Sequence, residues 1–199
     1  MKKQYISNPM RKVIIIGATG SLAEYVIQDL KGLENIELTL FVRNRNKLSK
    51  YLSDYCTVVE GNALNYTDIK KAVQGQDIVY INLEGDLETM SQNIVKAMQE
   101  EGVKRVIAIS SVGIYDTPLK SVLQPYRKLA DIIENSGLDY TVLRPDWFTN
   151  TNEISYSLTR KGEPETGSAI SRKSIADFVA KLINYPHLYV NENLGISRP

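Results

Sequence analysis

The chain has 199 residues, enough for one domain with a substantial core and too few for two large domains. Apolar residues make up 43% and charged residues 24% of the chain, which argues against a disordered or fibrous protein. The formal net charge of +1 disfavours nucleic acid or an acidic membrane surface as a general partner.

Cysteine and histidine usage excludes further classes. A single cysteine, Cys56, cannot form an internal disulfide, and a single histidine, His187, leaves no Cys/His cluster for a zinc site. Residues 1 to 11 read as a short polar leader without the apolar core of a signal peptide. No apolar run reaches the roughly 18 residues of a membrane span. We therefore expect a cytoplasmic protein with no metal site and no membrane segment.

The first predicted elements are a strand over 12–16 and a helix over 21–31, joined by a turn that contains Gly17 and Gly20. Glycines let a backbone approach an anion closely, and the positive end of the following helix faces that anion. The pattern therefore predicts a phosphate-binding loop, with Ala23 in the last position of a dinucleotide fingerprint. The spacing departs from the usual fingerprint, and an ordinary strand, turn and helix would look the same.

A second apolar strand, 36–42, ends abruptly in Arg43. In a dinucleotide-binding fold the residue at this place faces the adenosine ribose, where a carboxylate suits NAD and an arginine suits the 2′-phosphate of NADP. No carboxylate occurs between Val42 and Ser53, so the sequence favours NADP over NAD. The alternative is a solvated basic turn in which Arg43, Arg45 and Lys47 face water.

Strands and helices continue to alternate along the chain. Further strands are predicted over 56–60, 77–83, 103–110 and 140–143, and helices over 66–73, 87–101 and 125–135. The connections between successive strands are too long for hairpins and contain helices, which favours a doubly wound parallel sheet of Rossmann type with helices on both faces. Ligands bind such sheets beyond the carboxyl ends of the strands, which groups 17–23, Arg43, 61–63, 83–85, Ser110, Ser111 and 145–148 at one edge.

After residue 150 the pattern loosens. Residues 153–160 read as extended and 161–167 as a loop, and Ser171 is a plausible N-cap for a helix that stops before Pro186. We expect a single domain over 1–199, with about 150–199 forming a small lid beside the ligand edge.

Several blocks together resemble a known family. Gly-Ala-Thr-Gly at 17–20, Ile-Ser-Ser at 109–111, Leu-Arg-Pro at 143–145 and the stretches 136–141 and 171–177 resemble the atypical short-chain dehydrogenase/reductases, in particular their NmrA-like branch. The resemblance implies a Rossmann-type fold, a bound nicotinamide dinucleotide, and a loop after Pro145 near the nicotinamide. The residues predicted to bind the dinucleotide are Gly17, Thr19, Gly20, Ser21, Leu22, Arg43, Asn62, Ala63, Leu83, Ser110, Arg127, Pro145 and Trp147.

The resemblance does not supply the usual catalytic pair. Reductases of this superfamily use a tyrosine and a lysine four residues later, and the matching positions here are Leu123 and Arg127. Tyr126 does not complete the spacing either, since Ala130 follows it by four residues. Arg127 could hold ribose hydroxyls as a cation, but an arginine is a poor proton donor because it stays charged.

Ser111, Tyr115 and Arg127 remain the catalytic candidates. Ser111 could orient an acceptor or simply satisfy a strand end. Tyr115 could supply a phenolic proton or pack over a loop. Trp147 and Phe148 could form an apolar wall for a flat substrate or pack under the lid.

The leading hypothesis is an NADPH-dependent oxidoreductase acting on a small carbonyl, quinone or similar acceptor. The rival is a non-catalytic NADP(H) sensor that reports to a protein partner, which the missing pair favours. A nucleotide-sugar epimerase or dehydratase is weaker, because the chain offers little length for a sugar-binding domain. Whether the protein forms a homodimer or binds another protein is open.

Overall fold

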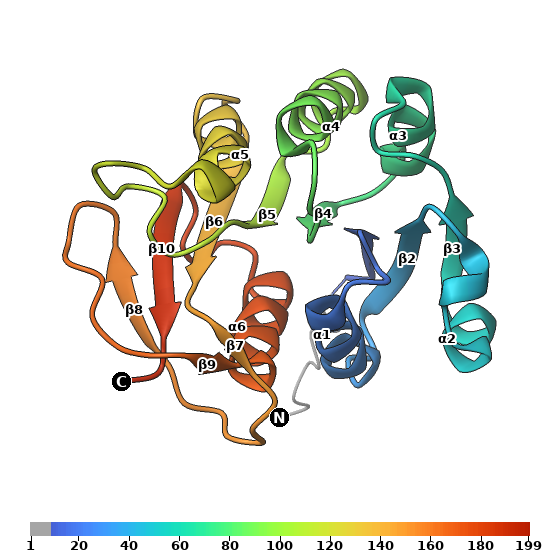
Figure 1. Ribbon diagram of the computed structural model, residues 1–199. Helices are drawn as coiled ribbons and strands as arrows, with labels where there is room; N and C mark the ends of the chain where they lie inside the picture. Colours follow the sequence, from blue (N-terminus) through green and yellow to red (C-terminus); the bar gives the residue numbers. More distant parts are fainter. Residues whose placement is uncertain (1–8) are drawn as a thin grey trace, which may run out of the picture.

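The computed structural model describes residues 9–199 (Figure 1). The first eight residues of the predicted leader lie outside the described residues, and the first strand already begins at Arg11. An eight-stranded sheet has the order β3-β2-β1-β4-β5-β6-β10-β8, parallel except for β8 against β10 (Figure 1). Its strands are β1 (Arg11–Ile16), β2 (Ile36–Val42), β3 (Thr57–Glu60), β4 (Ile78–Ile81), β5 (Arg105–Ile109), β6 (Asp139–Pro145), β8 (Ser157–Arg160) and β10 (Glu192–Ser197).

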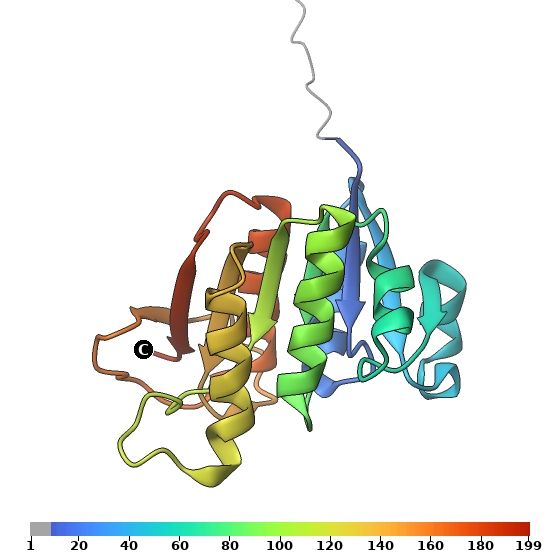
Figure 2. The same cartoon turned by 90° about the horizontal axis from the view of Figure 1, so that it is seen from above.

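Helices cover both faces of the sheet (Figure 2). The helices α1 (Ser21–Lys31) and α6 (Arg172–Asn184) pack together on one face. On the other face lie α3 (Tyr66–Val73), α4 (Leu87–Glu101) and α5 (Gln124–Glu134). Shorter elements are α2 (Lys50–Tyr55), the 3-10 turns η1 (Arg45–Lys47) and η2 (Ser121–Leu123), and a parallel ribbon of β7 (Phe148–Thr149) and β9 (Ile170–Ser171). The predicted doubly wound α/β fold is confirmed.

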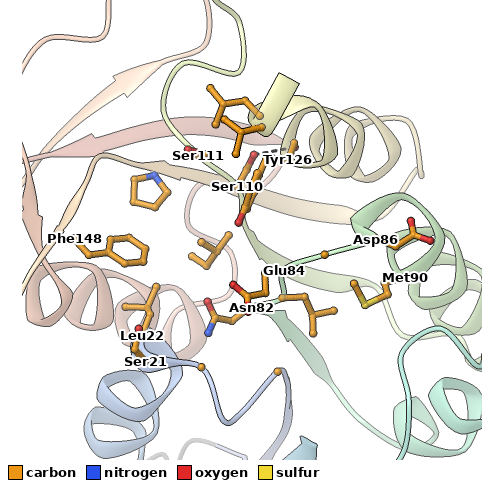
Figure 3. Close-up of a pocket in the computed structure, with 18 of the residues that line it drawn as sticks. Ser21, Leu22, Asn82, Glu84, Asp86, Met90, Ser110, Ser111, Tyr126 and Phe148 are labelled. Atoms are coloured by element: carbon orange, nitrogen blue, oxygen red, sulfur yellow. Dashed lines mark hydrogen bonds between the residues drawn. The ribbon is translucent and has the colours of Figure 1, made fainter. Parts of the chain in front are cut away.

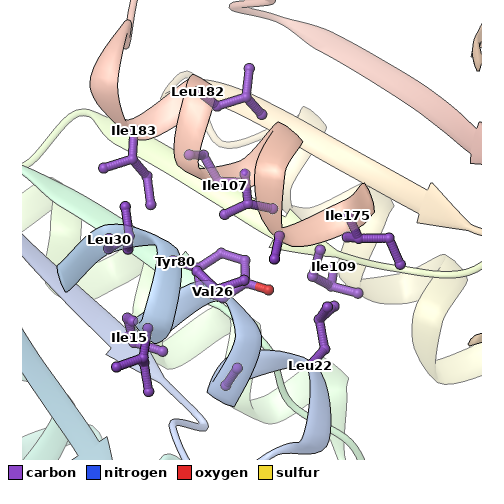
Figure 4. Packing of buried hydrophobic residues seen from close by; sticks show 14 of the residues in the cluster. Ile15, Leu22, Val26, Leu30, Tyr80, Ile107, Ile109, Ile175, Leu182 and Ile183 are labelled. Carbon is purple, nitrogen blue, oxygen red and sulfur yellow. The ribbon is translucent and has the colours of Figure 1, made fainter. Parts of the chain in front are cut away.

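The continuous apolar run of β1 reflects burial on both sides. Val13 and Ile15 point into the core beneath α1 and α6, whereas Ile14 and Ile16 point into the core beneath α3 to α5. Successive strand side chains alternate between faces, so a strand covered by two helical layers needs an apolar residue at every position. Figure 4 shows the first of these cores, where Val26 and Leu30 of α1 and Leu182 of α6 lie over Ile107 of the sheet.

Much of the segment 150–199, which the sequence predicts as a small lid beside the ligand edge, contributes to the sheet and to the helices that cover it. The helix α6 covers the sheet beside α1, and β10 pairs in parallel with β6. The sequence of β10 hides this position because Asn193, Gly195 and Ser197 interrupt its apolar residues. Asn193 is nevertheless buried, since its amide is bonded by Arg144, Tyr115 and Glu134, which come from distant parts of the chain.

The strand order brings the ligand edge together as expected. The sheet grows from β1 toward β3 on one side and from β4 toward β10 on the other, so the chain switches direction between β1 and β4. Open α/β sheets bind ligands in the crevice at such a switch point.

Candidate functional site

A cavity of about 1060 Å³ opens at the carboxyl ends of the parallel strands (Figure 3). This volume is at the upper end of the range for small-molecule sites, which suits a dinucleotide together with a second small molecule. We call the part lined by Gly17, 19–22, 41–43, Lys47 and 62–64 the glycine half. The part lined by residues that follow β4, β5 and β6, together with Glu165, is called the acidic half.

The glycine turn of the glycine half lies directly against the residue that follows β4. Gly17 has φ of +92°, and a Cβ there would stand 2.1 Å from the carbonyl oxygen of Asn82. A Cβ on Gly20 would stand 2.6 Å from Nδ2 of Asn82. Gly17 therefore needs glycine both for close packing and for its backbone conformation, whereas a side chain at Gly20 would require the Asn82 side chain to move.

The same turn leaves the start of α1 free to receive an anion. Gly20 is the N-cap and has no side chain to cap the helix. The backbone N–H of Glu24 bonds to the Gly20 carbonyl at 3.3 Å, so the preceding N–H groups, from Ser21 to Ala23, have no carbonyl one turn earlier. These donors and the helix dipole fit the pyrophosphate of a dinucleotide.

The remaining predicted residues of the glycine half also line the cavity. Arg43 and Lys47 are exposed at the end of β2, and Arg43 forms no ion pair within residues 9–199. By contrast Arg45 does not line the cavity, and its backbone N–H donates to the Glu60 carboxylate at 3.0 Å. The lining residues predicted for dinucleotide binding in this half are Gly17, Thr19, Gly20, Ser21, Leu22, Arg43, Asn62 and Ala63.

The acidic half contains two serines from the end of β5. The Ser110 hydroxyl is buried and donates to the backbone carbonyl of Tyr126 at 3.0 Å. The Ser111 hydroxyl is half-buried and donates to the carbonyl of Val112 at 3.1 Å. Both serines line the cavity, as do the predicted Leu83, Pro145 and Trp147.

Trp147 and Phe148 do not pack under a lid. The side chain of Trp147 is 81% exposed and that of Phe148 is 38% exposed, although both line the cavity. The Trp147 carbonyl accepts the N–H of Ile170 at 2.8 Å, and the Arg172 guanidinium lies 5.0 Å from the centre of the Phe148 ring. The ribbon of β7 and β9 thus holds these two aromatic residues at the rim of the acidic half.

Two of the three predicted catalytic residues lie outside the cavity. The Tyr115 hydroxyl accepts from Nδ2 of Asn193 at 2.8 Å, and burial, followed by the nearby Glu134, raises its pKa. The Nε of Arg127 lies 2.9 Å from the Asp131 carboxylate, and its guanidinium stacks 4.7 Å from the Tyr115 ring. Neither residue is among those that line the cavity, so the structure brings only Ser111 of the three to it.

Tyr126 lines the cavity, although its sequence spacing does not match a catalytic pair. It lies near the start of α5, and Figure 3 shows it beside Ser110, with Glu84 and Asn82 across the cavity. Burial, and to a smaller extent Glu84, raises the pKa of Tyr126. Its helical position facing the cavity could be found only once α5 was placed on the sheet.

Glu165 reaches the acidic half from the loop after β8. Its Oε1 lies 2.6 Å from Nε of Arg144, a residue only 1% exposed, and its Oε2 accepts the backbone N–H of Gly113 at 3.0 Å. This carboxylate therefore ties the loop that follows Ser111 to the end of β6. Asn82, just before the predicted stretch 83–85, also lines this edge.

Within 9–199, no helix is long and apolar enough to cross a membrane. In the same range, no three His, Cys, Asp or Glu side chains are grouped as metal ligands would be.

Comparison with known proteins gives a consistent picture. A Rossmann-fold NAD(P)-binding family protein from Shigella flexneri is 41% identical, with a TM-score of 0.88 over 96% of this chain and 94% of that chain. A short-chain dehydrogenase/reductase from Veillonella parvula, solved in complex with NADP, is 23% identical with a TM-score of 0.86, and 95% of each chain is covered.

Quinone oxidoreductase 2 from Escherichia coli is 27% identical over 141 residues, which are 69% of this chain. The match covers 49% of that protein, so this chain spans about half of its length. The family model described as NAD(P)H-binding matches residues 17–186, from the glycine turn to the end of α6. Together with the glycine turn and its cavity, this match means that the chain belongs to the NAD(P)H-binding family of Rossmann-fold proteins.

Proposed function

We propose that the protein is an NADPH-dependent oxidoreductase that acts on a small carbonyl, quinone or similar planar acceptor. The observation that carries the proposal is a single cavity whose glycine half suits a dinucleotide and whose other half is rimmed by Trp147 and Phe148. The names of the Escherichia coli and Veillonella parvula proteins support the same chemistry and the same cofactor. We also propose a cytoplasmic, single-domain protein.

The glycine half would hold the dinucleotide. The free N–H groups at the start of α1 would bind the pyrophosphate, and Arg43 would bind the 2′-phosphate that distinguishes NADP from NAD. When bound, NADPH supplies a hydride to an acceptor. Binding and orientation by the protein would supply much of the rate, because a fixed arrangement removes the entropy cost of encounter.

In the acidic half, the residues of this chain would orient the acceptor, and Ser111 or a water molecule would supply the proton that accompanies the hydride. The hydroxyl of Ser111 would donate a hydrogen bond to the acceptor oxygen in place of its bond to Val112. Trp147 and Phe148 would stack on a flat acceptor and exclude water from it.

A non-catalytic NADP(H) sensor is the alternative. The positions of Tyr115 and Arg127 favour it, because their polar groups are engaged with Asn193 and Asp131 and not with the cavity. Such a sensor would bind the dinucleotide equally well and report to a protein partner.

The cofactor part of the proposal is tested by titrating the protein with NADPH and NADH and following nucleotide fluorescence. Arg43→Ala should weaken NADPH binding about tenfold and leave NADH binding unchanged, since a charge-assisted contact to phosphate is lost. Arg45→Ala is the matched control, because Arg45 is exposed but does not line the cavity. Equal affinity for both nucleotides would contradict the role of Arg43.

The catalytic part is tested by NADPH oxidation with a panel of quinones and aldehydes. Turnover of at least one class, reduced by Ser111→Ala, supports the oxidoreductase. Tight NADPH binding without oxidation by any member of the panel would instead support the sensor.

A further inference from the structure

The two halves of the cavity carry opposite charge. The charged side chains that line the glycine half are Arg43 and Lys47. Among the residues that the structure describes, the only cationic residue lining the acidic half is Lys120. The acidic residues of that lining are Glu84, Asp86, Asp116, Asp146 and Glu165. The positive charge of the glycine half suits a phosphorylated nucleotide, whereas the negative charge of the acidic half repels an anionic ligand.

Most of these carboxylates form no ion pair with a cationic side chain of the described residues. Glu165 is paired with Arg144, but Glu84, Asp86, Asp116 and Asp146 form no ion pair within residues 9–199. Hydrogen bonds from Thr89 lower the pKa of Asp86, so this carboxyl is ionised at neutral pH. Glu84 is exposed to the cavity, and Figure 3 shows it beside Asn82 and opposite Ser110.

The acidic half also presents apolar surface to solvent at its rim. Trp147 is 81% exposed and Val122 is 70% exposed, and both line the cavity with Phe148. Large apolar side chains left open at a cavity mouth mark a surface that a ligand covers, and aromatic rings favour stacking on planar π-systems.

We propose that the acidic half selects planar aromatic acceptors that are uncharged or cationic and rejects anionic acceptors of the same shape. The selection combines stacking at the Trp147 rim with repulsion from unpaired carboxylates, foremost Glu84. This inference rests on the proposed function, because it assigns an acceptor class to the same cavity.

The single tryptophan of the chain provides a readout that does not depend on turnover. The full-length protein is saturated with NADP⁺, confirmed by calorimetry, and Trp147 fluorescence is then titrated with naphthoquinone, naphthoquinone sulfonate and a trimethylammonium naphthoquinone. The neutral and cationic quinones should quench Trp147 at concentrations about tenfold or more below the sulfonate. Equal affinity for the sulfonate, or no binding of any quinone, would overturn the proposal.

Matched variants separate local from general effects. Glu84→Gln should reduce the ratio of neutral-quinone to sulfonate affinity severalfold. Glu34→Gln makes the same charge change on an exposed residue that does not line the cavity, and it should leave this ratio unchanged. Val122→Ser should weaken binding of the neutral quinone severalfold. Ile154 is 59% exposed and absent from the lining, so Ile154→Ser should not change this affinity. If each variant matches its control, the proposal fails. If NADP⁺ itself does not bind in the calorimeter, the proposed function fails first.

Discussion

The two halves of the cavity are built by different means. In the glycine half, short consecutive stretches at the ends of β1 and β2 present backbone N–H groups and exposed cations. In the acidic half, the lining comes from segments far apart in the sequence, and bonds such as that of Glu165 with Arg144 and Gly113 hold it together. The first half depends on backbone shape, and the second depends on side chains that meet only in the folded chain.

The difference has a consequence for mutation. A backbone cradle tolerates no added atom, because neither Gly17 nor the Asn82 carbonyl can move without moving a strand. A side-chain network can lose one member and relax locally, so its loss should alter acceptor use more than dinucleotide binding. The following variants test this contrast.

Gly17→Ala should have the largest effect. Its Cβ would lie 2.1 Å from the Asn82 carbonyl oxygen at a φ of +92°, so we expect a loss of at least about 3 kcal/mol in the free energy of unfolding, together with loss of NADPH binding. Gly75→Ala is the control, since its φ is +73° but its Cβ would meet no atom within 4 Å, and it should cost only about 1 kcal/mol. Urea unfolding measures both, and similar losses would refute the steric explanation.

Glu165→Ala should act on the acidic half. Removing this carboxylate leaves the buried Arg144 guanidinium without its anion and the Gly113 N–H without its acceptor. We expect a loss of about 2 kcal/mol in the free energy of unfolding. Acceptor kcat/KM should fall while the Kd of NADPH stays within about twofold.

Glu163→Ala, two residues earlier and exposed, is the control for Glu165→Ala. It removes an acceptor for the Arg160 N–H at 2.9 Å but touches no residue of the cavity. A parallel loss of NADPH affinity in Glu165→Ala would show that the two halves are not separable.

Asp86 should stabilise the first turn of α4 to an extent that depends on pH. Its side chain caps the helix by accepting the Thr89 N–H at 3.1 Å, and hydrogen bonds from the side chain and then the backbone of Thr89 lower the pKa of Asp86 from 3.8. A carboxyl whose pKa falls on folding stabilises the protein above its unfolded pKa and loses that effect as pH falls through the folded value. Urea midpoints should therefore be lower for Asp86→Ala at neutral pH and converge with the unmodified protein below about pH 3. A difference that persists in acid would exclude the ionised cap as its cause.

Arg127→Gln should have the smallest effect. The pair with Asp131 spans one helical turn and both side chains are substantially exposed, so its loss should cost about 0.5 kcal/mol. Turnover and NADPH affinity should be unchanged, whereas Ser111→Ala should reduce turnover. A tenfold or larger loss of turnover in Arg127→Gln would restore Arg127 as a catalytic residue.

Several features follow from the sequence alone because they depend on neighbours along the chain. The apolar run of β1, the glycines at 17 and 20, and the N-cap at Ser171 each carry a local physical requirement, and each lies where expected. Alternating strands and helices of suitable length also dictate a parallel sheet, which brings the predicted dinucleotide residues to one edge, except Arg127.

Only the tertiary structure decided the rest. The strand β10 contains Asn193, whose burial is tolerable because Arg144, Tyr115 and Glu134 satisfy its amide. The orientation of α5 about its own axis places Tyr126 in the lining of the cavity and leaves its neighbour Arg127 outside it. Local sequence specifies a backbone cradle because the chemistry of glycine is local, whereas the acidic half depends on partners tens of residues apart, whose meeting no sequence spacing records.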